Sequence, residues 1–373
     1  MWLNVTILLV LLFLSIILDF LERSYRITPQ KSKKILIYVA FTLLVLQSGL
    51  RNVAVGPDTY AYFLRFTEDL SNSWYSVIEN FKSVYIDNEG KDAGYYLIQK
   101  LFSTIFPSFQ LFLIFIALCF FGSLFVLIDR YTSTKLDVLL AVLVYLSLFY
   151  SFFSVTGCRQ TIATSLCLYS VRYINERRLM IFLCLMVIAA SIHRSALIFI
   201  PFYFVAASSK SSYMFLIAML IMPLLISISN SYTSYLAVLS GSDSYLAYAD
   251  EGAAGSKSFL SFYVILTICL FLYQKRILSV SRDRLCILNG IYFALYFLPL
   301  TYSSAALMRV VQYFSLFIMI GVPFFVNTGK KRSSLNVRSI VVCLIVVALL
   351  YKLVFSGEEY CFFWQDMKLP DNY

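Results

Sequence analysis

About twelve apolar stretches follow one another along this sequence, separated by polar loops. A helix needs about 17–25 apolar residues to cross the hydrocarbon core of a bilayer, and shorter pieces are tolerated inside a bundle. With 60% hydrophobic residues and a mean hydropathy of +0.80, the chain carries more apolar surface than a soluble domain can bury. We therefore expect an all-α, polytopic transmembrane helical bundle, with residues 1–373 forming a single integral membrane domain. The expected segments are 2–21, 35–50, 109–128, 136–153, 159–174, 179–192, 195–207, 212–228, 258–274, 286–300, 305–326 and 339–356.

The positive charges of the short loops predict the orientation of these segments. The loop at 22–34 carries five basic residues, so we place it in the cytoplasm and the N-terminus outside. Residues 2–21 lack a basic leader and a cleavage site, so we expect a retained helix. Alternation from there puts 19 of the 30 basic residues inside. The outer regions are then two loops, 51–108 and 229–257, and a short C-terminal tail, 357–373. The net charge of +10 is thus an orientation signal and does not indicate nucleic-acid binding.

The eight cysteines do not indicate a metal site. Most fall inside apolar stretches, and none has the CxxC or Cys/His spacing of metal ligands. We expect no metal and no other cofactor. Cys158 and Cys361 both fall on the predicted outer side, which leaves a disulfide between them open.

Four strongly polar residues lie at or just inside the ends of apolar stretches, and the predicted topology puts all four ends outside. They are Arg159, His193, Arg194 and Arg309. An arginine at membrane depth costs about 2.5–3.5 kcal/mol on insertion scales. Several such charges on one face indicate a site for an anionic or strongly polar ligand.

Arg51 and Asp58 follow the second apolar stretch in a segment with turn chemistry, Gly56-Pro57-Asp58. Two interpretations of Asp58 are open. Its carboxylate either caps the N-terminus of a helix beginning at Thr59, or stands at the outer membrane surface to bind, or take a proton from, a sugar hydroxyl.

Arg159 and Gln160 open the segment 159–174, where a cation in the first turn opposes the helix dipole unless an anion joins it. Arg159 is therefore either a phosphate ligand or an arginine that reaches back to the headgroups. His193, the one histidine of the chain, stands beside Arg194 at a predicted break between two short segments. It is either a packing residue, a general base, or a hydrogen-bond donor to a leaving group.

Arg309, Gln312 and Tyr313 are spaced i, i+3 and i+4, so a helix places them on one face. Arg309 lies about one turn inside its segment, too deep to reach the headgroups without strain. It is either a substrate ligand or a donor to an unpaired carbonyl of another helix.

In this order, the motifs resemble the EpsG/Wzy-like family of oligosaccharide repeat-unit polymerases. The likeness lies in Arg51 with Gly56-Pro-Asp-Thr-Tyr60, in Ala93-Gly-Tyr-Tyr-Leu97, in Arg159-Gln160, in His193-x-Ser195-Ala-Leu197, and in Arg309 with Tyr313. The family usually has a Glu before the Gly-Tyr-Tyr piece, where this chain has Asp92 and Ala93. A Pro-Tyr pair that many members carry near the C-terminus is missing.

The resemblance implies a GT-C-like fold and the polymerisation of a surface glycan, an O-antigen (lipopolysaccharide) or a capsule. The substrate would be an undecaprenyl-diphosphate-linked oligosaccharide at the outer face of the bacterial cytoplasmic membrane. No cofactor is implied, because the lipid diphosphate is already activated. The expected partners are that substrate, membrane lipids and a chain-length regulator protein, and no nucleic acid.

On this view Arg159 and Arg309 hold the diphosphate through always-charged, bidentate contacts, and Arg194 assists them. His193 or Asp58 activates the acceptor hydroxyl, Arg51 orients the outer loop, and Gln160 and Tyr313 contact substrate.

Three other functions stay open. A flippase for lipid-linked oligosaccharide would also need cations, but in a central cavity reachable from both faces. A ligase that ends the glycan chain shares nearly all of the polymerase chemistry. An acyltransferase would need its histidine on the cytoplasmic side, opposite to the predicted side of His193.

Overall fold

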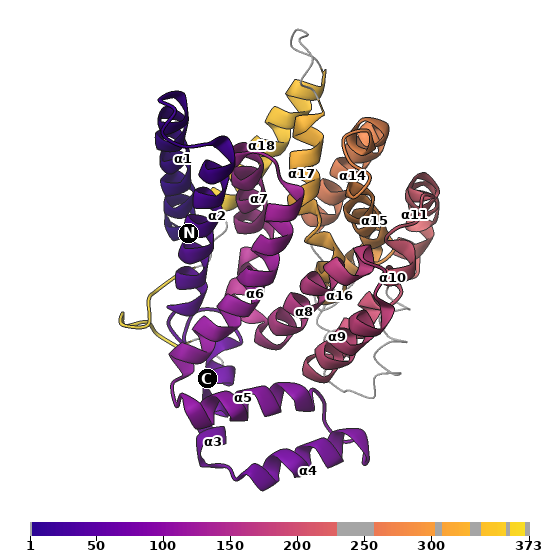
Figure 1. The fold of residues 1–373 in the computed structure, drawn as a ribbon. Coiled ribbons are helices and arrows are strands. Elements are labelled where there is room, and N and C mark those ends of the chain that lie inside the picture. The colour runs from indigo at the N-terminus through magenta and orange to yellow at the C-terminus, as the bar shows by residue number, and fades with distance from the viewer. Residues whose placement is uncertain (1, 230–256, 303–307, 329–336, 356–358, 370–373) are drawn as a thin grey trace. The chain divides into compact units, whose positions relative to one another are not determined.

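The computed structural model describes residues 2–229, 257–302, 308–328, 337–355 and 359–369 (Figure 1). Within these ranges the chain is helical, and the one β element is an isolated bridge between Arg51 and Phe362. The predicted all-α class is confirmed. The outer loop predicted at 229–257 lies almost wholly outside the described residues.

Every predicted apolar range contains helix, but several ranges hold shorter or broken pieces. The elements are α1 (Trp2–Arg23), α2 (Pro29–Gly49), α3 (Thr59–Ser71), α4 (Trp74–Tyr85), α5 (Ala93–Ile105), α6 (Phe109–Tyr131), α7 (Lys135–Leu148), the π-helix η1 (Ser151–Thr156), α8 (Cys158–Asn175), α9 (Leu179–Ile192), the 3-10 helix η2 (Arg194–Phe199), α10 (Phe202–Val205), α11 (Ser211–Ser227), α14 (Lys257–Leu278), α15 (Arg284–Ala294), the 3-10 helix η3 (Leu298–Tyr302), α16 (Met308–Ser315), α17 (Ile318–Asn327) and α18 (Val337–Phe355).

Five of the described helices are long and apolar enough to cross a membrane by themselves: α1, α2, α6, α14 and α18. A sixth span is counted if α16 and α17, which are bent by 42° at their junction, are taken together. The expectation of about twelve spans is therefore confirmed only in its coarser form, as a protein with several apolar membrane helices. Hydropathy counts apolar residues, whereas a continuous span also needs an unbroken helix.

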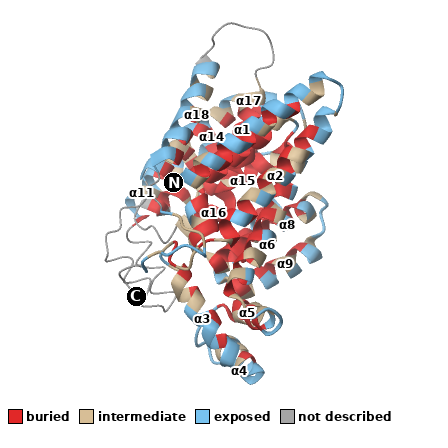
Figure 2. Ribbon diagram, turned by 90° about the vertical axis from the view of Figure 1, so that its left-hand side faces the viewer, coloured by how far each residue is buried: buried red, intermediate tan, exposed pale blue. Residues whose placement is uncertain are grey.

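The chain forms two compact units, residues 1–197 with 334–373 and residues 198–333. In the first unit α2 packs along α6, α6 along α8, and α18 against α7. Its core is aromatic: the rings of Phe120 and Phe153 stack 4.7 Å apart, and Tyr145 packs against Phe121 at 5.3 Å. Figure 2 shows buried residues along α6 and α8, in contrast to the largely exposed α4.

Helices α3, α4 and α5 come from the predicted outer loop 51–108 and lie together at one end of the first unit (Figure 1). Lys100 of α5 joins them, because its Nζ donates to the carbonyl oxygens of Asp69 and Asn72, each at 2.6 Å. A cation placed there satisfies the last carbonyls of α3.

The tail of the chain folds back onto the end of α2 in the same unit. The backbone N–H of Asn52 donates to the Cys361 oxygen at 2.9 Å, and that of Phe363 donates to the Leu50 oxygen at 2.9 Å. Cys361 and Cys158 are both free thiols, so the disulfide that the sequence left open does not form.

The second unit contains α10, α11, α14–α17 and η3. Its core is again aromatic, with Phe314 stacked 5.2 Å from Phe199. Asn289 of α15 donates to three carbonyls at the end of α10 and so closes that helix terminus.

Candidate active site

Asp92, a residue that the sequence analysis did not assign to the site, is the centre of a charged cluster in the first unit. It precedes α5 and adopts the left-handed conformation, with φ 61° and ψ 40°, which is uncommon for a residue other than glycine. It occupies the N-cap position, yet its side chain makes no capping hydrogen bond to its own helix. The carboxylate is instead turned inward, and the side chain is only 3% exposed.

A close approach of two helices brings Asp92 to its partners. A Cβ added at Gly94 would lie 2.3 Å from the Ser191 Oγ and 2.8 Å from the Ser191 carbonyl carbon. Only glycine therefore allows the start of α5 to pack against the end of α9. The next residues after α9 are His193 and Arg194, and they meet Asp92 there.

Three groups converge on the Asp92 carboxylate. The Arg159 Nη1 donates to Oδ2 at 2.8 Å, and the Arg194 backbone N–H donates to Oδ1 at 3.2 Å. The His193 Nδ1 lies 3.4 Å from Oδ2. A buried charge is tolerated only when it is paired and hydrogen-bonded, and these contacts meet that condition.

These contacts also keep Asp92 ionised. Burial raises the pKa of its carboxyl group, but hydrogen bonding and charge from His193, with the charge of Arg159, outweigh burial and leave the pKa below its ordinary value. The cluster therefore holds a fixed negative charge beside the imidazole at neutral pH.

His193 is held by the break that the sequence predicted. Helix α9 ends at Ile192, His193 is extended, with φ −153° and ψ 109°, and η2 begins at Arg194. The His193 side chain is 17% exposed. Because Nδ1 faces the carboxylate, a proton is favoured on Nδ1 and the lone pair of Nε2 is left to act as a base. An ionised Asp92 would also stabilise the imidazolium formed when Nε2 takes up a proton.

Arg159 stands in the first turn of α8, directly after the π-helix η1 and Gly157. Asp92 supplies the anion that a cation at this helix end requires. The Arg159 Nε donates to the Tyr62 hydroxyl at 3.4 Å, and the guanidinium lies 5.9 Å from the Tyr62 ring centre. The Arg159 side chain is 21% exposed, and its Nη2 has no partner among the described residues.

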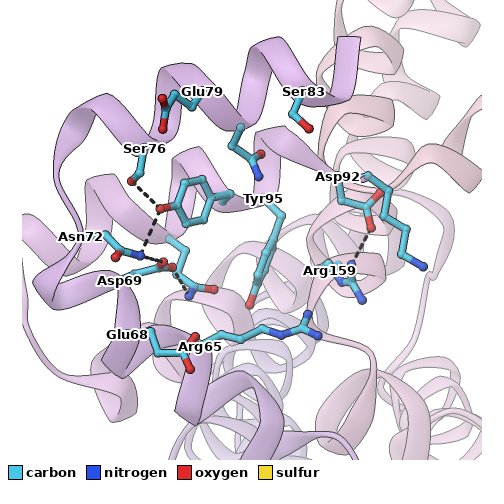
Figure 3. A pocket seen from close by; sticks show the side chains of 14 residues that line it. Arg65, Glu68, Asp69, Asn72, Ser76, Glu79, Ser83, Asp92, Tyr95 and Arg159 are labelled. Atoms are coloured by element: carbon cyan, nitrogen blue, oxygen red, sulfur yellow. Dashed lines mark hydrogen bonds and ion pairs between the residues drawn. The ribbon is translucent and has the colours of Figure 1, made fainter. Parts of the chain in front are cut away.

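Asp92 and Arg159 line one end of a cavity of about 570 Å³ between α3, α4 and α5 (Figure 3). All of its lining side chains are charged, hydroxyl-bearing, amide-bearing or tyrosine side chains. The lining comprises Arg65, Glu68, Asp69, Asn72, Ser76, Glu79, Asn80, Ser83, Lys91, Asp92, Tyr95, Tyr96, Gln99 and Arg159. The cluster thus opens into a polar space, as a site for a hydrophilic ligand requires.

Asp58, Arg51 and Gln160 lie outside this lining. Asp58 occupies the N-cap of α3 but makes no side-chain capping hydrogen bond, so the capping interpretation is wrong in that respect. Arg51 is 4% exposed and donates to the Ser48 carbonyl oxygen at 2.6 Å and to the Cys158 Sγ at 3.6 Å. It therefore joins the end of α2 to the start of α8. Its Nε also donates to the Thr59 Oγ1 at 3.4 Å, at the start of α3, and its role in orienting the outer loop stays a prediction. Gln160 is buried in α8.

The remaining predicted residues divide between the two units. Arg194 contributes its backbone N–H to the cluster, and its side chain is exposed. Arg309, Gln312 and Tyr313 all belong to α16 of the second unit, where Tyr313 is fully buried and Gln312 is 6% exposed. Their shared helix is confirmed, and their meeting with Arg159 stays a prediction.

Asp92, Tyr62 and Tyr95 are the site residues that the sequence analysis missed. One signal pointed to the first of them: Asp92 stands close to where the related motif carries a glutamate before Gly-Tyr-Tyr. Tyr95 stands in the Ala93-Gly-Tyr-Tyr-Leu97 motif, which was noted but given no role, and no comparable signal marks Tyr62 among the 28 tyrosines of the chain.

Comparison with known proteins gives one result. The model of the EpsG family matches residues 34–364, which is most of the chain and includes all of the cluster residues. No curated protein and no solved structure matches the sequence.

Proposed function

Because this chain belongs to the EpsG family, whose members are polysaccharide polymerase-type membrane proteins, we propose that it is a membrane glycosyltransferase that polymerises a surface glycan. Its donor is an oligosaccharide repeat linked to undecaprenyl diphosphate, and the product is an O-antigen or capsular polysaccharide. The reaction takes place at the outer face of the bacterial cytoplasmic membrane.

The Asp92–His193 pair beside Arg159 is the observation that supports this proposal. The His193 Nε2 accepts the proton of an acceptor hydroxyl, and the hydroxyl oxygen forms a bond to the anomeric carbon of the donor sugar. The bond from that carbon to the diphosphate oxygen breaks, and the lipid diphosphate leaves with the electron pair. Asp92 orients the imidazole and stabilises its charged form.

Arg159 serves the leaving group. Asp92 occupies its Nη1 and Tyr62 accepts from its Nε, so Nη2 is the donor left for a phosphate oxygen. Charge that develops on a leaving diphosphate is best stabilised by donors already in place, and Arg159 is fixed by two contacts before substrate binds. Arg194 and Arg309 are the further cations that we assign to the diphosphate.

A base fixed by a carboxylate favours transfer chemistry over transport, because a flippase moves its cargo without breaking a bond. The glycan profile of a deletion strain separates the alternatives. A polymerase deletion leaves single-repeat glycans on the cell surface, a flippase deletion leaves no surface repeats, and a ligase deletion leaves long chains on the lipid carrier.

Complementation of that strain tests the residues. We expect Arg159→Ala and His193→Ala to yield single-repeat glycans, and Arg178→Ala, which changes an arginine that is 60% exposed, to restore a normal ladder. Immunoblots of the membranes control for the amount of protein. A normal ladder from Arg159→Ala would contradict the proposal, and full polymer from His193→Ala would pass the role of base to Asp58.

A further inference from the structure

The cavity between α3, α4 and α5 extends well beyond the charged cluster. Its volume of about 570 Å³ falls in the range of about 300–1,000 Å³ that is usual for small-molecule sites. Asp92 and Arg159 mark one end, and the rest of the wall comes from α3, α4, α5 and the residues that connect them.

Tyr95 supplies the observation that points to a ligand. The residue is 6% exposed, and its hydroxyl is buried with no hydrogen-bond partner among the described residues. Figure 3 shows the Tyr95 side chain among the residues that line the cavity. Its ring is fixed by edge contact with Tyr62 at 5.9 Å and by Phe112 at 6.1 Å. Buried polar groups are nearly always hydrogen-bonded, so an unpaired hydroxyl in a cavity wall indicates a position where a bound ligand supplies the missing hydrogen-bond partner.

The opposite part of the wall is held by its own hydrogen bonds. The Gln99 Nε2 donates to the Asp69 Oδ2 at 2.5 Å, and the Asn72 Nδ2 donates to Oδ1 at 3.2 Å. The hydroxyls of Ser76 and Tyr96 are 2.8 Å apart. These polar groups are therefore fixed in position before a ligand arrives, which reduces the entropy lost on binding.

The mixed charge of the wall identifies the ligand class. Glu68 and Glu79 line the cavity together with Arg65 and Lys91. A diphosphate would be repelled by the carboxylates. A sugar hydroxyl donates to a carboxylate and accepts from a guanidinium or a tyrosine hydroxyl, so it suits both kinds of side chain.

We propose that this cavity is the subsite for a sugar ring of the glycan substrate, next to the bond that forms, and that the Tyr95 hydroxyl is a direct ligand of that ring. This proposal rests on the proposed function, and it assigns one sugar ring of the polymerase substrate to this cavity. Arg65 and Glu68 provide further contacts, and the choice of side chains on α3 and α4 then sets which repeat is accepted.

Binding to the purified full-length protein in detergent tests the subsite. The probe is the repeat oligosaccharide of the host strain, released from its lipid by mild acid and freed of phosphate, and the measurement is isothermal titration calorimetry. We expect Tyr95→Phe to weaken binding about 3- to 10-fold, the contribution of one neutral hydrogen bond. The thermal midpoint of Tyr95→Phe should equal or exceed that of the wild type, because the hydroxyl has no partner to lose. Tyr75→Phe, an exposed tyrosine of α4 outside the lining, should bind like the wild type.

Inorganic pyrophosphate is the second probe. It distinguishes a failure of the sugar subsite from a failure of the proposed polymerase function. We expect its binding to weaken in Arg159→Lys and to be unchanged in Tyr95→Phe. Oligosaccharide binding that is absent, or equal in Tyr95→Phe and wild type, would overturn the subsite even if the deletion strain makes only single repeats. A deletion strain with a normal ladder would overturn the polymerase itself.

Discussion

Replacement of Asp92 by asparagine removes one negative charge and keeps the shape of the side chain. The carboxylate accepts a charge-assisted hydrogen bond from Arg159 at 2.8 Å and a second one from the Arg194 N–H at 3.2 Å. A hydrogen bond to a charged group contributes about 1.5–3 kcal/mol. The Arg159 side chain is 21% exposed and gains water when its partner is neutral, which offsets part of this loss. We therefore expect Asp92→Asn to lower the free energy of unfolding by about 2 kcal/mol, the lower half of that range.

The effect on activity should be larger than the effect on stability. An asparagine cannot hold His193 in the tautomer with a free Nε2 as an ionised carboxylate does, nor stabilise the imidazolium, so the rate loses much of the general-base contribution of about 10²–10⁴. The assay is the initial rate of ladder formation from lipid-linked repeats with purified protein, normalised to folded protein by thermal denaturation. Asp87→Asn, at an exposed aspartate of the same loop, is the matched control. An Asp92→Asn enzyme that is destabilised but polymerises at the wild-type rate per folded molecule would refute the reasoning and leave Asp92 a structural residue.

Three further predictions follow from the same contacts. The lowered pKa of Asp92 means that its ion pair stabilises the fold above about pH 4, near the ordinary value of 3.8, and that this stability is lost as pH falls through the lowered pKa; the gap in thermal midpoint between wild type and Asp92→Asn should be present at pH 5 and shrink at pH 3. Gly94→Ala should abolish polymer and destabilise the protein by about 1–3 kcal/mol, because the added methyl meets the Ser191 backbone; a normal ladder would show that α5 and α9 separate without consequence. A membrane-impermeant maleimide should label Asp87→Cys but not Asp283→Cys in intact cells, with the wild type as background, and the reverse pattern would overturn the predicted topology.

Hydropathy located the helices well and their breaks poorly. The segment predicted at 179–192 is α9 with those same bounds, and its break at His193 follows from a polar pair inside an apolar stretch. The segment predicted at 136–153 instead ends as α7 at Leu148 and continues as the π-helix η1. Such a change of hydrogen-bonding pattern leaves no periodicity in the sequence, and it occurs here where Phe153 of η1 stacks on Phe120 of α6.

The candidate site was half predictable for a similar reason. Arg159 and His193 were found because a charge inside an apolar stretch demands an explanation. Asp92 follows Asn88-Glu-Gly-Lys91, a run that is typical of a solvated loop. Its contact with His193, 101 positions further along the chain, exists only because Gly94 packs on α9. Contacts between residues so far apart in the sequence are created by the tertiary fold, and no local sequence pattern predicts them.

The way in which Asp92 departs from local rules argues that it is kept for function. It adopts a left-handed conformation, it forgoes the capping bond that an aspartate at the N-cap normally makes, and it buries a charge. Each of these costs stability, and an apolar replacement of a buried ion pair is often neutral or stabilising. Glycine would adopt this left-handed turn without strain if Arg159 and His193 needed no carboxylate beside them. The arrangement suits the reaction proposed above, in which the imidazole side of the carboxylate would activate the acceptor hydroxyl and the guanidinium side would receive the charge of the leaving diphosphate.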